Sequence, residues 1–141
     1  MSDVDLLPDD LQPKSLSGRD IVLLYDDVLA ALDHFAATGV APFAWEGLIR
    51  RPADLFTHAV RRVTLLDGST VTGIIHMAIV DREEGEGWSA YVARSVETCR
   101  LTIEDAQRAW DDQPGMLGAR LHYSLGVWTA EEYAEAYGPT T

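Results

Sequence analysis

The sequence predicts an α+β domain in which helices cover one face of a mainly antiparallel sheet of about four strands. Apolar residues recur at helical spacing in the first third of the chain, a hairpin signal stands in the middle, and a cleanly alternating segment lies near the end. We expect the elements in the order α-α-β-β-β-α-β-α, since strands that follow one another closely form antiparallel meanders.

The first segment, residues 1–16, holds two prolines and four aspartates among scattered leucines. We expect it to form an extended, mobile, acidic arm, because short polar termini rarely pack unless something ties them down. The remaining residues, 17–141, are long enough to bury one core and are expected to form a single α+β domain.

The next segment predicts a long helix over residues 19–38. Ser17 stands at the cap position with Asp20 three residues later, apolar residues follow at helical spacing, and Gly39 supplies the stop. A short strand over 21–25 followed by a helix capped by Asp26 is the alternative, and periodicity leaves both open.

Two weaker segments follow. Residues 39–51 combine Pro42, Phe43, Trp45 and Gly47, which predicts an irregular apolar connection. Pro52 suits the first position of a helix, so residues 52–60 are predicted as a short helix.

The sheet is predicted from the middle of the chain onwards. Residues 63–66, the turn pair Asp67-Gly68 and residues 70–80 form a hairpin signal. A polar loop over 81–87 precedes a third predicted strand at 88–97, which completes a meander.

The last elements are marked by their caps. Thr102 and Asp105 predict a helix over 103–112, and Thr129 with Glu132 predicts a final helix over 130–137. Between them, residues 119–127 alternate between apolar and polar side chains, as a half-buried strand does.

Charge is the strongest functional signal. The formal net charge is −12, with acid-rich ends around a mildly basic middle, residues 48–80. Such a surface favours basic partners and argues against direct nucleic-acid binding. The acidic start of the chain does not resemble a targeting signal, and the apolar runs are too short to span a bilayer. We therefore expect a cytoplasmic protein with no membrane contact.

The motifs that mark common cofactor and metal sites do not occur in this sequence. It has no phosphate-binding glycine loop, no dinucleotide fingerprint and no His-Glu-x-x-His, and its one cysteine, Cys99, excludes a cysteine-based zinc site. The acidic runs 81–86 and 111–112 lack the spacing of a calcium loop. We expect no cofactor and no metal.

One pattern leaves room for chemistry. On the predicted strands, His76 and His122 point away from the apolar face, and Arg120 shares that side with His122. If both strands belong to one sheet, these three residues could bind an anion or serve acid–base catalysis. A small enzyme or ligand-binding protein with this catalytic face is therefore an alternative function.

The leading hypothesis is a non-catalytic acidic binding module. Its most concrete form is a bacterial immunity or antitoxin-like inhibitor that docks on a basic, nucleic-acid-directed toxin or enzyme, because charge complementarity speeds such association. Tryptophan is a frequent anchor at interfaces. A structural or assembly subunit is a third possibility. The predicted partner-binding residues lie in the acidic loop, directly after it, or in the apolar segment 39–51: Glu83, Glu84, Glu86, Trp88 and Trp45.

Overall fold

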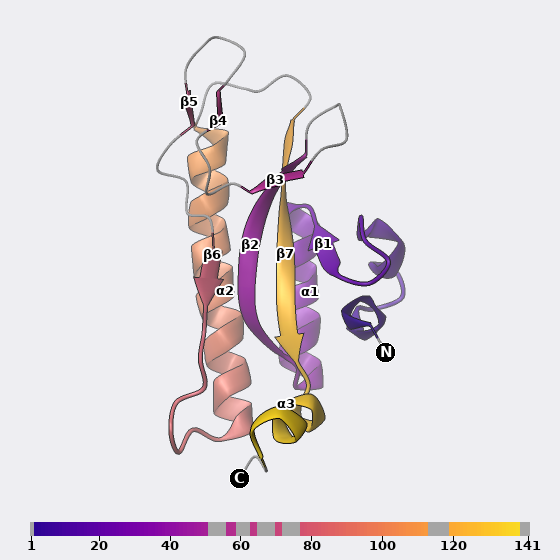
Figure 1. The fold of residues 1–141 in the computed structure, drawn as a ribbon, viewed down its shortest axis with the longest axis vertical. Helices are drawn as coiled ribbons and strands as arrows, with labels where there is room; N and C mark the ends of the chain where they lie inside the picture. Colours follow the sequence, from indigo (N-terminus) through magenta and orange to yellow (C-terminus); the bar gives the residue numbers. More distant parts are fainter. Residues whose placement is uncertain are drawn as a thin grey trace.

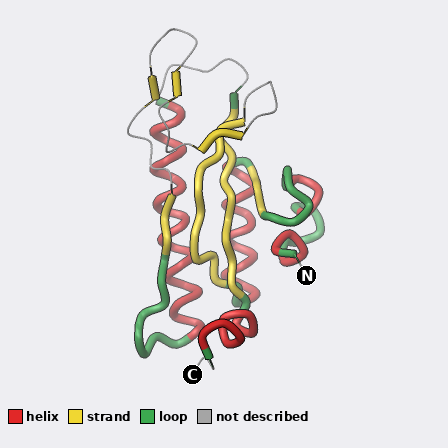
Figure 2. Tube along the Cα trace, in the orientation of Figure 1, coloured by secondary structure: helices red, strands yellow, loops and turns green. Residues whose placement is uncertain are grey.

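The computed structural model describes residues 2–50, 56–58, 63–64, 70–71, 77–112 and 119–138 of the chain, and it shows an α+β fold. An antiparallel sheet is built around two long strands, β2 (Ala41–Arg50) and β7 (Arg120–Trp128). Figures 1 and 2 show these strands side by side, with helices α1 (Tyr25–Thr38) and α2 (Trp88–Asp111) packed behind them. The predicted class is confirmed, while several elements differ from the predicted order.

The sheet order is β1-β7-β2-β3, and β6 also pairs with β2. In this arrangement β1 (Ile21–Leu23) lies outside β7, while β3 (Phe56–His58) and β6 (Met77–Ile79) pair with different stretches of β2. All of these pairs are antiparallel. A separate two-stranded sheet joins β4 (Val63–Thr64) to β5 (Thr70–Val71).

The strand β2 corrects the prediction of an irregular connection over 39–51. Proline has no N–H for a sheet ladder, and here Pro42 sits where the β2–β7 register shifts, a position that tolerates it. The neighbouring Phe43 ring lies over Gly126, where an added Cβ would meet Phe43 Cζ at 2.9 Å. Glycine at position 126 therefore makes room for the ring on the irregular part of the strand pair.

The segment before α1 follows the alternative prediction rather than the long helix over 19–38. Residues 21–23 form β1, and the helix begins at Tyr25 after Leu24 at the cap position, not after Asp26. Ser17 Oγ accepts the N–H groups of Arg19 and Asp20 at 3.1 and 3.0 Å, which forms a local turn ahead of the strand. The helix ends as predicted at Gly39, whose φ of 77° suits glycine.

The longest helix, α2, replaces both the strand predicted at 88–97 and the helix predicted at 103–112. Its buried side chains recur every three or four residues and face the sheet and α1, which is a helical period. Thr102 does not cap a helix, because its hydroxyl donates to Thr98 O at 2.7 Å inside α2. The buried face of this helix consists of Tyr91, Val92, Ser95, Val96, Cys99, Ile103 and Ala106.

Residues 2–16 pack against the domain instead of extending from it. They form two short 3-10 turns, Asp3–Leu6 and Gln12–Lys14, and bury Val4, Leu7 and Leu11 in the core. The backbone N–H of Val4 donates to Arg19 O at 3.1 Å. The leucines that looked scattered therefore belong to the hydrophobic core, which ties this terminus down.

The middle of the chain matches the predictions in part. Antiparallel pairing of β4 with β5, with Val63 opposite Val71, agrees with the predicted hairpin, while its predicted turn at 67–68 lies outside the described residues. The helix predicted at 52–60 is wrong for residues 56–58, which form β3. β6 pairs with β2 and not with a third meander strand, because residues 88–97 are helical.

The last two elements are confirmed. In β7 the predicted apolar set, Leu121, Tyr123, Leu125 and Val127, is buried. The helix α3 (Ala130–Tyr137) has the predicted capping box, in which Thr129 and Glu132 exchange two hydrogen bonds of 3.0 Å. Among the described helices, none is long and apolar enough to cross a membrane.

Candidate functional site

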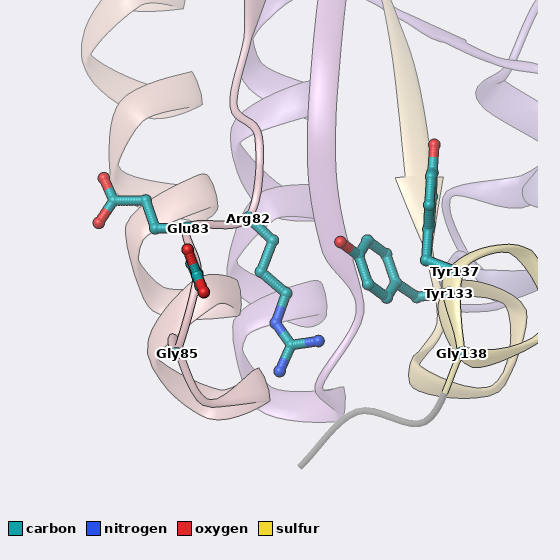
Figure 3. Close-up of a pocket in the computed structure, with 7 residues that line it drawn as sticks. Arg82, Glu83, Gly85, Tyr133, Tyr137 and Gly138 are labelled. Atoms are coloured by element: carbon teal, nitrogen blue, oxygen red, sulfur yellow. The ribbon is translucent and has the colours of Figure 1, made fainter.

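An open cleft lies between the loop that follows β6 and the helix α3. It has a volume of about 490 Å³ and is drawn in Figure 3. Arg82 and Tyr133 extend toward each other across it, from the loop and from α3 respectively. The residues that line this cleft are Arg82, Glu83, Glu84, Gly85, Tyr133, Tyr137 and Gly138.

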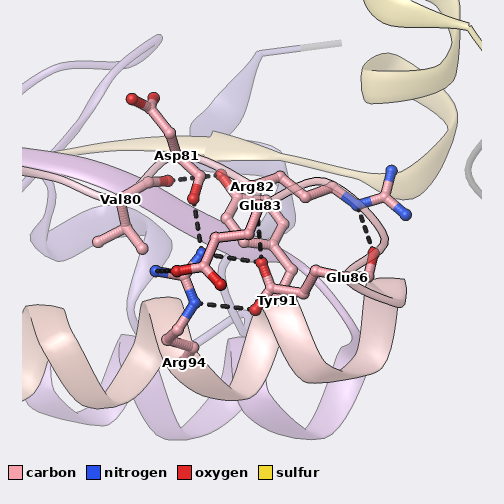
Figure 4. Close-up of polar contacts among 7 residues, drawn as sticks. All are labelled: Val80, Asp81, Arg82, Glu83, Glu86, Tyr91 and Arg94. Atoms are coloured by element: carbon pink, nitrogen blue, oxygen red, sulfur yellow. Dashed lines mark hydrogen bonds and ion pairs between the residues drawn. The ribbon is translucent and has the colours of Figure 1, made fainter.

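The loop wall of the cleft is held by Arg94 of α2 (Figure 4). The guanidinium of Arg94 donates from Nε and Nη2 to the two carboxylate oxygens of Glu86, each at 2.8 Å. The same Nη2 donates to Asp81 O at 2.6 Å. A bidentate arginine–carboxylate pair fixes both distance and orientation, so the loop is attached to α2 at its two ends.

Glu86 is an internal part of this loop and not a surface charge. Only 11% of its side chain is exposed, and its Oε1 also accepts the N–H of Glu83 at 3.0 Å. The hydrogen bond from Arg94, with help from the Glu83 N–H, lowers the pKa of Glu86 to about 2. Among the three glutamates predicted to bind a partner, only Glu83 and Glu84 are exposed.

Below the cleft lies an aromatic cluster that joins α2, α3 and the end of β7. Tyr133 is its centre, with ring centroids 4.7 Å from Tyr137, 5.6 Å from Trp88 and 5.9 Å from Trp128. Such tilted and edge-on pairs are the preferred arrangements of aromatic rings. The cluster consists of Phe43, Trp88, Tyr91, Trp128, Tyr133 and Tyr137.

Two arginines pack on rings of the aromatic cluster. The guanidinium carbon of Arg82 lies 5.3 Å from the Tyr133 ring centroid, and that of Arg94 lies 5.8 Å from the ring of Tyr91. The Tyr91 hydroxyl donates to Val80 O at 2.7 Å, and burial raises the pKa of Tyr91 to about 12. The outermost member is Tyr137, which is 69% exposed.

The predicted tryptophan anchors are internal or partly so. Trp45 is 1% exposed and donates from Nε1 to Thr102 Oγ1 at 2.8 Å, so it lies in the core and not on a surface. Trp88 is half-buried, donates to Gly39 O at 2.8 Å and packs against Tyr91 and Tyr133. Its indole therefore packs against Tyr133, which lines the cleft.

The predicted histidine face is brought together only in part. His76 lies outside the described residues, while His122 is 4% exposed and not on an open surface as expected. On the strand ladder Arg120 pairs with Arg50 and His122 with Leu48. Burial, and then the charges of Arg50 and Arg120, lower the pKa of His122, which favours its neutral form.

Sequence reasoning missed Tyr133, Tyr137 and Arg94. The two tyrosines are four residues apart on a helix that was itself predicted, and that spacing places them on one face. Arg94 was missed because its segment was interpreted as a strand. Arg94 lies within the first two turns of α2, and from there its side chain reaches back to Glu86 in the loop.

The cleft and its surroundings are rich in carboxylates. Residues 81–86, 94 and 131–135 hold seven carboxylates and two guanidinium groups. Within the part of the chain that the structure describes, no three His, Cys, Asp or Glu side chains come together as a metal site. A fixed loop, exposed carboxylates and partly exposed tyrosines suit the binding of a positively charged surface.

No protein-family model, no curated protein and no solved structure matches this chain.

Proposed function

We propose that the protein is an acidic binding module that docks on a basic partner protein through the cleft between residues 82–85 and α3. The observation that carries this proposal is the set of hydrogen bonds from Arg94 to Glu86 and Asp81, called here the Arg94 clamp. It holds the loop in one conformation while Glu83 keeps 73% of its side chain exposed. The most concrete form of this function is an immunity or antitoxin-like inhibitor that covers the phosphate-binding surface of a nucleic-acid-directed enzyme.

The charge distribution supports this function through kinetics. A net charge of −12 attracts a basic surface over a distance of about 10 Å at ordinary ionic strength. Complementary charges speed association and orient the two surfaces before contact. The carboxylates near the cleft would then occupy positions that phosphates take on the partner.

The fixed loop supports this function through affinity. A flexible acidic loop loses conformational freedom on binding, and that loss offsets part of the gain from new contacts. The hydrogen bonds from Arg94 to Asp81 and Glu86 already impose this order in the free protein. Tyr137 adds an exposed aromatic side chain, and tyrosine is enriched among residues that dominate binding energy.

The test is affinity capture from native lysate, followed by association kinetics with the captured protein. The double variant Glu83→Gln/Glu84→Gln should slow association by about tenfold at low salt, and physiological salt should shrink that difference. The matched control is Asp111→Asn/Asp112→Asn, which removes the same charge at the other end of α2. Since α2 has 24 residues, this control lies about 36 Å from the loop.

The proposal requires the two double variants to differ. If they slow association equally, net charge alone attracts the partner and the cleft is not the docking surface. If neither variant changes the rate at low salt, docking on a basic partner is wrong.

A further inference from the structure

We infer that the sheet face turned away from the helices carries an anion site, in which Arg50 and Arg120 bind the oxygens of a phosphate group. The site is independent of the proposed docking cleft, which lies at the other end of β7. Arg120 begins that strand and Trp128 ends it beside α3, about 26 Å away (Figure 1). Two observations carry the inference, the register of the strands and the charges that act on His122.

The register of the two long strands places Arg50 and Arg120 on one face of the sheet. They are directly opposite each other in the β2–β7 ladder, next to the pair of Ile49 and Leu121. Ile49 and Leu121 are buried in the core between the sheet and the helices. Because successive side chains of a strand point to opposite faces, the two arginines point away from the helices. Directly opposite residues have Cβ atoms about 5 Å apart, so both guanidinium groups can reach one ligand.

His122 provides separate evidence that the two positive charges act on one place. It follows Arg120 by two residues on the same face, opposite Leu48, and is 4% exposed. Burial lowers the pKa of His122 most, and the charges of Arg50 and Arg120 lower it further. Because such an effect falls off with distance, both guanidinium groups lie near the imidazole. The positive potential that disfavours an imidazolium ion at this place favours an anion.

Two like charges opposite each other in a ladder are unfavourable for the sheet. A phosphate group between the guanidinium groups would replace their repulsion by attraction to both, with charge-assisted hydrogen bonds from each. Arg50 already has an interaction partner, and the inference does not need this residue to be free. A guanidinium has several N–H donors in a fixed fork, so Arg50 can keep its partner and bind an anion as well.

The local charge at this end of the sheet is opposite to that of the whole chain. Residues 48–80 contain four arginines and two aspartates, whereas the net charge of the chain is −12. β2 has one carboxylate, that of Glu46, which lies four residues before Arg50, about 13 Å along the strand. Exposed charges more than about 10 Å apart are largely screened at ordinary ionic strength. An anion at this site therefore responds mainly to the two arginines.

Phosphate fits this site better than a carboxylate. Its tetrahedral oxygens point in several directions, so one phosphate group can accept hydrogen bonds from both guanidinium forks at once. A carboxylate has its two oxygens on one side and matches a single fork. Phosphate also carries more negative charge near neutral pH, and its attraction to two nearby cations is stronger in proportion. The site should therefore distinguish phosphate from acetate.

The test titrates the whole protein with inorganic phosphate and, in parallel, with acetate, at fixed pH and with the ionic strength held constant by sodium chloride. Chemical shifts of the His122 ring protons and of the Arg50 and Arg120 amides report on binding. We expect saturable shifts with phosphate, which should bind about threefold or more tightly than acetate. A third titration with O-phosphoserine distinguishes the sources of the phosphate group. Binding at least as tight as that of phosphate identifies a small phosphate ester as the ligand, weaker saturable binding identifies the free ion, and both results support the site.

Variants identify the groups that bind. Arg120 is exposed, so Arg120→Gln should keep the fold, and it should weaken phosphate binding by about tenfold. Arg120→Lys keeps the charge but loses the planar fork, and it should weaken binding by about threefold. The matched control is Arg100→Gln, which removes the same charge from α2, where Arg100 pairs with Asp33, and should bind like the wild type. Equal binding of phosphate and acetate, or an Arg120→Gln variant that binds like the wild type, overturns the inference.

The outcome is separate from that of the proposed function, because the titration uses no partner protein. Glu83→Gln/Glu84→Gln removes two negative charges at the far end of the sheet and should leave phosphate binding within about twofold of the wild type. If this double variant changes phosphate binding as much as Arg120→Gln does, phosphate responds to net charge alone and the anion site is wrong. Acidic docking is judged by the association rates of the captured partner, so either idea can fail while the other stands.

Discussion

The hydrogen bond between Trp45 and Thr102 links the central strand to the longest helix. The indole of Trp45 is 1% exposed, and its N–H donates to Thr102 Oγ1 at 2.8 Å. The same hydroxyl donates to Thr98 O, so it accepts one hydrogen bond and donates another. The indole N–H of a buried tryptophan usually has a hydrogen-bond acceptor, and this acceptor helps to fix the position of the side chain.

Replacing Thr102 by valine should destabilise the fold by about 1–3 kcal/mol, because the shape is kept while the Trp45 N–H loses its acceptor. Urea denaturation of Thr102→Val, Trp45→Phe and the double variant measures this. In the double variant donor and acceptor are both removed, so its cost should be about 1 kcal/mol less than the sum of the single costs. Additive costs would show that the hydrogen bond contributes nothing to stability.

The loop 81–87 and the start of α2 act as one element. Arg94 connects them through Glu86 and Asp81, and Glu86 N–H also donates to Glu83 O at 3.0 Å. Because the pKa of Glu86 is lowered to about 2, this carboxylate stays charged in the folded protein under conditions where it would be protonated in an unfolded chain.

The pH dependence of stability tests this element. The contribution of Glu86 is fully present above its unfolded pKa of 4.5 and is lost as the pH falls toward about 2. The difference in unfolding free energy between wild type and Glu86→Gln should therefore be constant above pH 4.5 and shrink below it. Urea titrations across that range measure it, and Arg94→Lys serves as a control that keeps the charge but loses the bidentate geometry. A difference that does not shrink on acidification would separate Glu86 from the clamp.

Elements with strong local signals could be predicted from the sequence, whereas elements fixed by distant contacts could not. Gly39, the capping box at Thr129 and the alternation in β7 act within a few residues, and each was placed correctly. The strand β2 carries Pro42 and Gly47, and its pairing with the distant strands β7, β3 and β6 holds it extended.

The misread start of α2 had a direct effect on the predicted site. Residues 88–97 contain alternating apolar and polar stretches, and the helical period becomes clear only when the segment is extended to Ile103 and Ala106. Because this segment was predicted as a strand, the contact between Arg94 and Glu86 was not foreseen. The sequence alone therefore did not distinguish the exposed Glu83 from the internal Glu86. Glu83 and Glu84 were predicted to bind a partner and line the cleft, while the positions of Tyr133 and Tyr137 depend on how α3 packs on α2 and β7.

At the scale of the whole molecule, the charge of −12 acts on folding as well as on docking. Like charges repel more strongly in the compact state than in the expanded chain, and salt screens that repulsion. The ion pairs at the surface act in the opposite direction, but exposed pairs contribute little. The net effect of sodium chloride should therefore be stabilising.

Thermal unfolding in sodium chloride from about 10 mM to about 0.5 M measures this effect, since the Debye length falls from about 30 Å to a few Å over that range. We expect Tm to rise by about 3 °C or more, which corresponds to roughly 1 kcal/mol for a domain of this size. The variant Glu83→Gln/Glu84→Gln carries two fewer negative charges and should show a smaller rise. A Tm that falls with salt would mean that attractive pairs, such as Arg94 with Glu86, outweigh the repulsion. In that case the exposed acids near the cleft would carry no cost in the free protein, and the partner would gain only the attraction and no relief of repulsion on binding.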